Sequence, residues 1–318
     1  MTFKFHAAAL GLTALLAFAG NAHAQTKIIG GIAAYNEALL PVYVAEDKGY
    51  FKDAGIALEL TNFKGGGPTV QALVSGSIQI CFCAADHVVR LRSRRQPAVI
   101  LVGLDTFHSY ALIAKASAPY KDLASLKGKR IGITSPGSLT DNTLRYAIKE
   151  LKLSPERDFE IAGAGAGSAM KAAIDSGQID AGLVILTEIA ALLKEPNAYK
   201  VVVDYRHLPY PSYAALALES WVKDNPTVAK GFTKALGKAI ADVEKDPELA
   251  RKTIAKMYPN FSPELVAEVA KSAVERMPKG GIVTEESIKN LNDILIAADS
   301  SLKPVTLQEA FDPAMLKD

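Results

Sequence analysis

One pattern of residues occurs twice in this chain, about one hundred positions apart, and it constrains the fold more than any other feature. The first copy joins a glycine run at residues 65–67 to the sequence SGSIQ at residues 75–79. The second joins the glycines within residues 163–167 to the sequence SGQID at residues 176–180. Both copies predict strand, helix, strand, glycine-rich loop, helix and strand in that order. Two such units predict two similar α/β lobes with a cleft between them.

Residues 1–24 have the features of an export signal. Lys4 supplies a positive start, residues 7–19 are apolar and uncharged, and residues 22–24 read Ala-His-Ala, a pattern that a signal peptidase cuts. The apolar stretch is too short to span a bilayer, which takes about 20 apolar residues. We therefore expect a soluble, periplasmic protein that starts near Gln25.

The composition indicates a globular protein. The chain has 318 residues, of which 49% are hydrophobic and 22% charged, and its formal net charge is only +2. Such a chain can bury a large core, and its weak, unclustered charge does not favour a nucleic-acid partner. We expect a monomer.

The known catalytic and cofactor motifs are not matched. The glycines of residues 163–167 depart from the spacing Gly-x-Gly-x-x-Gly of dinucleotide sites, and the sequence holds no Walker lysine and no His-Glu-x-x-His. Two of the five histidines belong to the export segment. His108 and His207 are interpreted as hydrogen-bond partners in loops more readily than as ligands. We expect no catalysis, no metal and no cofactor.

Cys81 and Cys83 are the only cysteines of the chain and belong to a predicted strand. Extended geometry places their Cα atoms about 6.6 Å apart on one face, toward the outer limit for a disulfide. We expect two buried thiols, with a strained redox pair or a soft-metal site as the alternative.

The chain after residue 213 predicts one further strand, at residues 214–218, and then helices. Their starts are marked by caps followed by proline or acidic residues, at Asn225-Pro226, Asp246-Pro247, Ser262-Pro263 and Thr284. This tail is expected to pack on the first lobe. The first lobe would then comprise residues 25–112 and 214–318, the second residues 113–213, with the hinge near residues 110–115 and 213–218.

Ligands of open α/β sheets bind beyond the carboxyl ends of the strands, where helix N-termini provide unpaired N–H groups. The loops at those ends supply the candidate ligand-binding residues. In the first lobe these are Tyr35, Asn36, Gly66, Cys83, Ala85, Asp86 and His108, and in the second lobe Ser135, Gly137, Ser138, Leu139, Thr140, Gly165, Ser168, Thr187, Glu188 and Arg206.

Several candidates have a purely structural alternative. Ser138 with Asp141 three residues later fits a helix cap, and Asp141 disfavours a strongly anionic ligand there. Asp86 and Glu188 are either partners of a donor-rich ligand or solvated loop residues. Arg206 is the best anion partner of the second lobe, although a surface salt bridge is the more common role for such a residue.

Three segments resemble the periplasmic substrate-binding proteins of ABC importers. They are ALLPVYVAEDKGYF at residues 38–51, LASLKGKRIGI at residues 123–133, and the ending from residue 283 to residue 311. The subgroup resembled handles aliphatic sulfonates, taurine, nitrate and thiamine-pyrimidine precursors, and the resemblance covers essentially all of the mature chain. The cysteine-containing strand is not typical of it.

The resemblance implies a type II periplasmic-binding-protein fold of class α/β, in which each lobe is a mostly parallel sheet flanked by helices and two strands form the hinge. It also implies capture of a small polar organic molecule, such as a sulfonate, carboxylate or pyrimidine, and delivery to an ABC permease at the inner membrane. One alternative is an enzyme that resembles the thiamine-pyrimidine synthases, which use pyridoxal phosphate. Another is a protein that presents its ligand to a sensor receptor.

Overall fold

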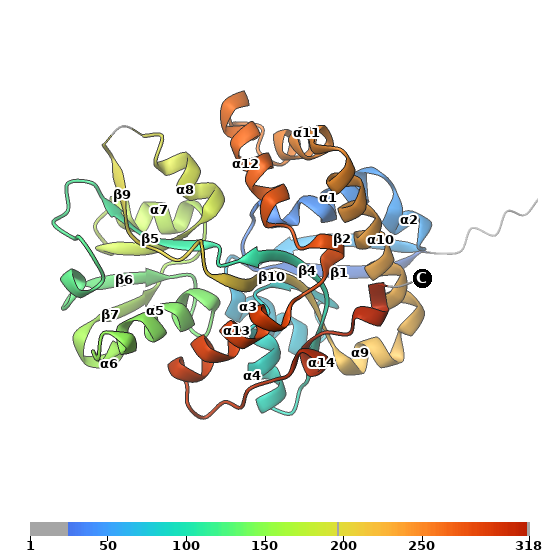
Figure 1. Ribbon diagram of the computed structural model, residues 1–318, viewed down its shortest axis with the longest axis horizontal. Helices are drawn as coiled ribbons and strands as arrows, with labels where there is room; N and C mark the ends of the chain where they lie inside the picture. Colours follow the sequence, from blue (N-terminus) through green and yellow to red (C-terminus); the bar gives the residue numbers. More distant parts are fainter. Residues whose placement is uncertain (1–24, 196, 317–318) are drawn as a thin grey trace, which may run out of the picture.

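The computed structural model describes residues 25–195 and 197–316, so the export segment expected at residues 1–24 lies outside the described residues. Two lobes, each built on a five-stranded sheet, lie side by side (Figure 1). The second lobe is the green one, and the first combines the blue N-terminal part with the orange and red C-terminal part. In the described ranges, no helix is long and apolar enough to cross a membrane.

The sheet of the first lobe has the strand order β2-β1-β3-β10-β4. Strands β2, β1 and β3 pair in parallel, whereas β10 is antiparallel to both of its neighbours. The five strands are β1 (Thr26–Ile32), β2 (Ile56–Asn62), β3 (Ile80–Cys83), β4 (Ala98–Phe107) and β10 (Pro209–Leu218).

The sheet of the second lobe repeats this arrangement in the order β7-β6-β8-β5-β9. Here β5 is the single antiparallel strand. The strands are β5 (Tyr110–Lys115), β6 (Arg130–Ile133), β7 (Glu160–Gly163), β8 (Ala181–Ile185) and β9 (Tyr199–Asp204). The expectation of two mostly parallel sheets of like topology is confirmed.

The chain crosses between the lobes at residues 108–109, which join β4 to β5, and at residues 205–208, which join β9 to β10. These crossings were expected near residues 110–115 and 213–218. Residues 110–115 are instead part of β5 in the second sheet, and residues 213–218 are part of β10 in the first sheet. Each crossing leads directly into the antiparallel strand of the next lobe.

Helices cover the sheets of both lobes. Those of the first repeat are η1 (Glu37–Leu39), α1 (Leu40–Asp47), α2 (Tyr50–Asp53), α3 (Gly66–Val74) and α4 (His87–Ser93). Those of the second are η2 (Ala124–Leu126), α5 (Leu139–Glu150), α6 (Pro155–Asp158), α7 (Ser168–Asp175) and α8 (Leu186–Leu192).

The C-terminal part is helical as expected. Its helices are α9 (Glu219–Asp224), α10 (Pro226–Lys245), α11 (Pro247–Met257), α12 (Pro263–Arg276), η3 (Lys279–Gly281), α13 (Glu285–Ala298), α14 (Leu307–Ala310) and η4 (Pro313–Leu316). Helices α10, α11, α12 and α13 start at the four predicted caps, whereas the other helices of this part were not predicted. Helix α13 packs against β10 and also against α5 of the second lobe, where Lys149 Nζ donates to the carbonyls of Ala297 and Ala298 at the end of α13. The tail therefore braces both lobes.

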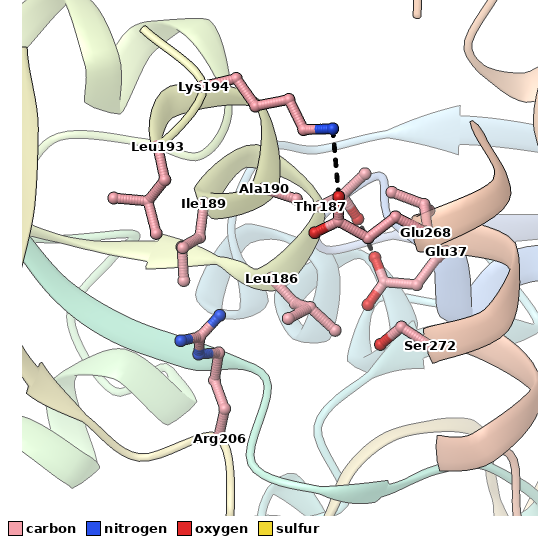
Figure 2. A pocket seen from close by; sticks show the side chains of 11 residues that line it. Glu37, Leu186, Thr187, Ile189, Ala190, Leu193, Lys194, Arg206, Glu268 and Ser272 are labelled. Atoms are coloured by element: carbon pink, nitrogen blue, oxygen red, sulfur yellow. Dashed lines mark hydrogen bonds and ion pairs between the residues drawn. The ribbon is translucent and has the colours of Figure 1, made fainter. Parts of the chain in front are cut away.

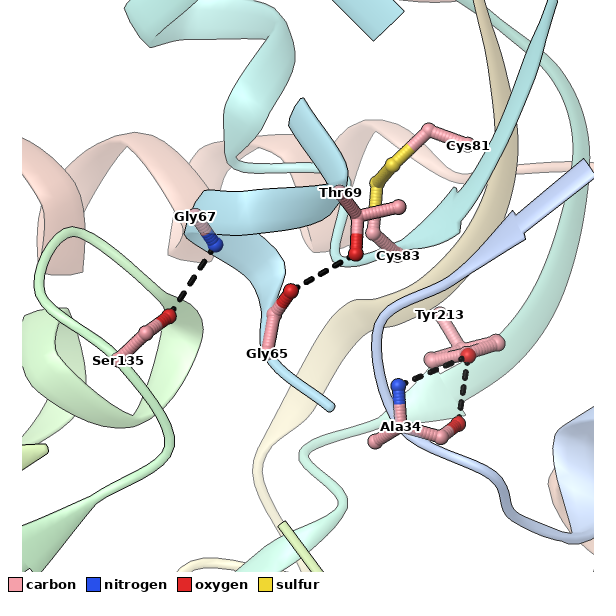
Figure 3. The surroundings of a disulfide bond; sticks show 8 residues. All are labelled: Ala34, Gly65, Gly67, Thr69, Cys81, Cys83, Ser135 and Tyr213. Carbon is pink, nitrogen blue, oxygen red and sulfur yellow. Dashed lines mark hydrogen bonds between the residues drawn. A yellow bond between two sulfur atoms is a disulfide. The ribbon is translucent and has the colours of Figure 1, made fainter. Parts of the chain in front are cut away.

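Cys81 and Cys83 form a disulfide bond, so the expectation of two free thiols is wrong (Figure 3). Their Cα atoms lie 5.6 Å apart, closer than a fully extended strand would place them and well within the range of disulfides. Both residues are fully buried, and β3 pairs with β1 on one side and β10 on the other.

The core of the first lobe contains three buried phenylalanines. Phe232 of α10 lies 5.4 Å from Phe51 and 6.3 Å from Phe82 between ring centroids, and all three side chains are almost fully buried. Such aromatic pairs add to the free energy that burial already contributes. They attach the C-terminal part to the first sheet.

We therefore expect Phe232→Ala to lower the free energy of unfolding by about 3–5 kcal/mol, because it removes both ring contacts and leaves a cavity. Urea denaturation measures this loss. The matched control is Leu151→Ala, whose side chain is 45% exposed and whose loss should be about 0.5 kcal/mol. Equal effects of the two substitutions would contradict this account of the core.

Candidate functional site

Three cavities lie along the boundary between the lobes. The largest, here called the aromatic cavity, has a volume of about 330 Å³. Its wall in the first lobe is formed by Tyr35, Tyr258 and Phe261, and residues of α7 and α8 close it from the second lobe. The second-lobe residues are Gly167, Ser168, Lys171, Val184, Thr187, Glu188, Ala191, Leu192 and Glu195. A molecule in this cavity would touch both lobes.

The second cavity, here called the inner cavity, is about 20 Å³ in volume, about the space that one water molecule needs. It lies where the N-terminal ends of α3 and α5 meet, and its walls include Gly66, His87, Tyr110 and Ser138. His87 is buried, and its Nε2 has no hydrogen-bond partner in the described part of the chain. A Cβ atom on Gly66 would lie 2.7 Å from that nitrogen, so the glycine permits the close approach.

The third cavity, here called the rim cavity, has a volume of about 180 Å³ and lies between α8 and α12 (Figure 2). Lys194 and Glu268 form an ion pair of 3.1 Å across it. Arg206 lines the cavity too, yet its guanidinium is held by Asp204 through Nε at 2.8 Å and Nη2 at 2.6 Å. Arg206 therefore forms the salt bridge that was named as the more common role of such a residue.

The helix N-termini at the cleft already have partners. At α3, the Gly67 N–H donates to Ser135 Oγ of the other lobe at 3.1 Å (Figure 3). At α5, Ser138 Oγ accepts from the Asp141 N–H, as the predicted cap requires, and the Asp141 carboxylate accepts from the Gly137 N–H at 2.7 Å. Part of the N–H donors at each end therefore has a partner within the protein.

At α7, the carboxylate of Glu188 lies beside the helix N-terminus. A Cβ atom on Gly167, the residue before the helix, would lie 3.0 Å from Glu188 Oε1, and Gly167 has a φ of +70°. This glycine therefore meets two demands, a left-handed backbone and the approach of the carboxylate.

Direct hydrogen bonds join the lobes across the cleft. Asn142 of α5 donates from Nδ2 to the Asp86 carboxylate, and its Oδ1 accepts from Arg90. Arg90 also forms an ion pair of 3.4 Å with Asp299. On the other side of the cleft, Thr187 Oγ1 donates to the carboxylate of Glu37. These contacts belong to a closed arrangement of the lobes.

The cleft holds acidic groups whose charge is poorly solvated. Burial raises the pKa of Glu37 to about 7, and the nearby Asp105 carboxylate contributes to the rise. Burial raises the pKa of Glu188 to about 7 as well. Burial also lowers the pKa of His108 to about 3, with a contribution from Arg276, and lowers the pKa of His87. The two imidazoles are therefore neutral at pH 7.

The structure separates the candidate residues into two groups. Those that line a cavity are Tyr35, Gly66, Ser138, Leu139, Ser168, Thr187, Glu188 and Arg206. Those that line none of the three are Asn36, Cys83, Ala85, Asp86, His108, Ser135, Gly137, Thr140 and Gly165. Several of the second group make hydrogen bonds within the protein instead. Asn36 caps η1, His108 Nε2 is hydrogen-bonded to Thr143 Oγ1 at 2.7 Å, and Thr140 Oγ1 accepts from the Thr134 N–H.

Sequence reasoning missed other residues of these cavities, among them His87, Tyr110, Lys171, Tyr258 and Phe261. His87 directly follows the loop that was singled out and could have been included with it. Tyr258 and Phe261 lie between α11 and α12 in the C-terminal part, and no local pattern marks this connection as part of a cleft.

The fold is that of the two-lobed periplasmic binding proteins. A protein of Bordetella bronchiseptica RB50 shares it with a TM-score of 0.82 at 24% identity, over 92% of this chain and 96% of that one. The alkanesulfonate-binding protein SsuA of Xanthomonas axonopodis pv. citri shares it with a TM-score of 0.71 at 18% identity, over 91% of this chain and 98% of that one.

The chain belongs to the NMT1/THI5-like family, whose model matches residues 36–250. The taurine-binding periplasmic protein of Escherichia coli is 29% identical over 66% of this chain and 65% of its own length. The 4-amino-5-hydroxymethyl-2-methylpyrimidine phosphate synthase THI5 of Saccharomyces cerevisiae is 26% identical over 74% of this chain and 71% of its own. Fold and relatives together support a solute-binding role.

The raised pKa of Glu37 predicts a pH dependence of stability. The folded protein retains the Glu37 proton up to about pH 7, whereas the unfolded chain releases it near its ordinary pKa of 4.5. This group therefore stabilises the folded state fully below about pH 4.5, and that contribution is lost as the pH rises to 7. Wild type should lose stability relative to Glu37→Gln over this window, by about 3 kcal/mol at most.

Thermal unfolding between pH 4.5 and 7.5 measures the difference between the two proteins. The exposed Glu150, changed to Gln, is the matched control and should follow the wild-type curve. Parallel curves for wild type and Glu37→Gln would contradict the raised pKa of this buried carboxyl.

Proposed function

We propose that the chain is the solute-binding component of an ABC importer and captures a small polar organic molecule between its lobes. The observation that carries this proposal is the aromatic cavity, which takes its walls from both lobes. A solute that contacts both lobes stabilises the closed form over the open one, and the closed shape is what a transport partner can distinguish.

The names of the relatives support a small organic solute. Taurine is the ligand named for the Escherichia coli relative, and alkanesulfonates are named for the Xanthomonas protein of like fold. Within this proposal the protein works in the periplasm as a monomer, after removal of residues 1–24, and delivers its solute to a permease at the inner membrane. A sensor receptor in place of the permease is the alternative for the last step.

An enzymatic role is the second candidate, because one of the relatives is named a pyrimidine phosphate synthase. A pyridoxal phosphate enzyme needs a lysine that can lose its proton and form a Schiff base. Lys171 lines the aromatic cavity, but hydrogen bonds to Asp175 and Tyr199 raise its pKa further. Lys194 of the rim cavity is held by Glu268. These lysines do not fit the cofactor.

Binding of a solute is tested by thermal unfolding of the purified protein in the presence of sulfonates, carboxylates, nitrate, pyrimidines and organic amines. A solute at one hundred times its dissociation constant should add about 2.7 kcal/mol to the stability. Tyr258→Ala should abolish most of the shift, because it removes one wall of the cavity. Lack of a shift across the whole panel would contradict the solute-binding role.

The enzymatic alternative predicts an absorbance band when pyridoxal phosphate is added, because a Schiff base to a lysine absorbs visible or near-ultraviolet light. We expect no such band in wild type, and therefore no difference between the absorbance spectra of wild type and Lys171→Met. A band lost in that variant would establish the cofactor site and contradict the assignment as a binding protein.

A further inference from the structure

Glu188 is a carboxylate without a partner inside the described ranges. It lies in the first turn of α8 and lines the aromatic cavity. Burial raises its pKa to about 7. No side chain of the described residues is hydrogen-bonded or ion-paired to it, and its Oε1 lies beside the N-terminus of α7, next to Gly167. A carboxylate removed from water and left unpaired costs free energy, so this group favours an occupant that brings a hydrogen-bond donor or a positive charge.

The wall that faces Glu188 across the cavity is aromatic. The rings of Tyr258 and Phe261 are stacked with their centroids 4.7 Å apart, and Tyr35 meets Tyr258 edge to face at 5.5 Å. Such a wall suits a flat apolar body, and the negative face of an aromatic ring attracts a cation. The two walls together match a planar molecule with a positive nitrogen group at one end.

The positive groups near the cleft are already bound to protein partners. Lys171 Nζ lies 2.8 Å from Asp175, Arg206 is held by Asp204, and Arg276 forms an ion pair of 2.8 Å with Asp105. The two buried histidines are neutral, as shown above. An anionic solute would therefore have to compete with a carboxylate of the protein for each of these three cations.

The negative groups act together at the centre of the cleft. Burial raises the pKa of the Tyr110 hydroxyl, and three nearby carboxylates raise it further, those of Glu188, Glu37 and Asp86. The N-terminal ends of α3, α5 and α7, which could offset this field, lie beside Ser135, Asp141 and Glu188, respectively. The potential of the cleft is therefore negative.

We propose that the solute of this protein is an organic cation with a planar body, whose protonated nitrogen group binds Glu188 while its ring lies against Tyr35, Tyr258 and Phe261. This inference rests on the proposed solute-binding role and names the chemical class of the solute. It departs from the anionic sulfonates bound by structural relatives, because the cations that line the described walls, Lys171, Lys194 and Arg206, each form an ion pair with a carboxylate of the protein.

Three probes of almost equal shape test the class by titration calorimetry at about pH 8. Benzamidine is a planar cation, benzamide is its neutral counterpart and benzenesulfonate is an anion. We expect benzamidine to bind on the order of tenfold more tightly than either of the others, and Glu188→Gln to remove this preference. Glu150→Gln removes the same charge from the exposed end of α5 in the same lobe and should leave the preference unchanged.

Benzenesulfonate binding as tightly as benzamidine, or benzamidine binding equally to wild type and Glu188→Gln, would overturn the cationic class and leave the solute-binding role intact. Binding of none of the probes would overturn it too, and the broad solute panel then decides the role separately. The thermal unfolding temperature of Glu188→Gln, expected at or above that of wild type because an unpaired charge is removed, shows that the variant is folded.

Discussion

The side-chain amide of Asn142 connects the two lobes, and the geometry of the cleft depends on this connection. It donates to Asp86 in the first lobe and accepts from Arg90 of the same lobe. Both first-lobe groups are anchored at α4, next to the loop that lines the inner cavity. The amide bonds one charged group of each sign, while Asp86 Oδ1 and Arg90 Nε have no hydrogen-bond partner among the described residues. The closed cavities exist only while such contacts hold.

Closure has an electrostatic cost that the protein leaves partly uncompensated. Glu37 has Thr187 as its partner across the cleft, whereas Glu188 has none in the described ranges. A buried carboxylate with a raised pKa often marks a functional site. Here the strain would be relieved by the solute itself, and the solute would in return stabilise the closed form. The buried Glu188 carboxylate thus raises the free energy of the empty closed form and, in our proposal, also selects a cationic solute.

The duplicated pattern was enough to predict the two sheets, their largely parallel strands and the helical tail, because hydrophobic periodicity and helix caps are local signals. The crossings at residues 108–109 and 205–208 were expected a few residues later in the chain, since the strands that follow them look like any other strand. The Cys81–Cys83 bond was missed because it depends on a local contraction of β3. The cleft residues Tyr258 and Phe261 come from the tail, and only the tertiary packing brings them to the second lobe.

The central claim is that direct contacts through Asn142 hold the lobes closed. Small-angle X-ray scattering of wild type and Asn142→Leu, both without added solute, tests it most directly. The leucine has a similar volume but removes this partner of Asp86 and Arg90, so the lobes should be open in more of the molecules and the radius of gyration should exceed that of wild type. The wild-type value should still decrease toward that of the closed structure when solute is added. Identical curves for the two proteins would contradict the claim.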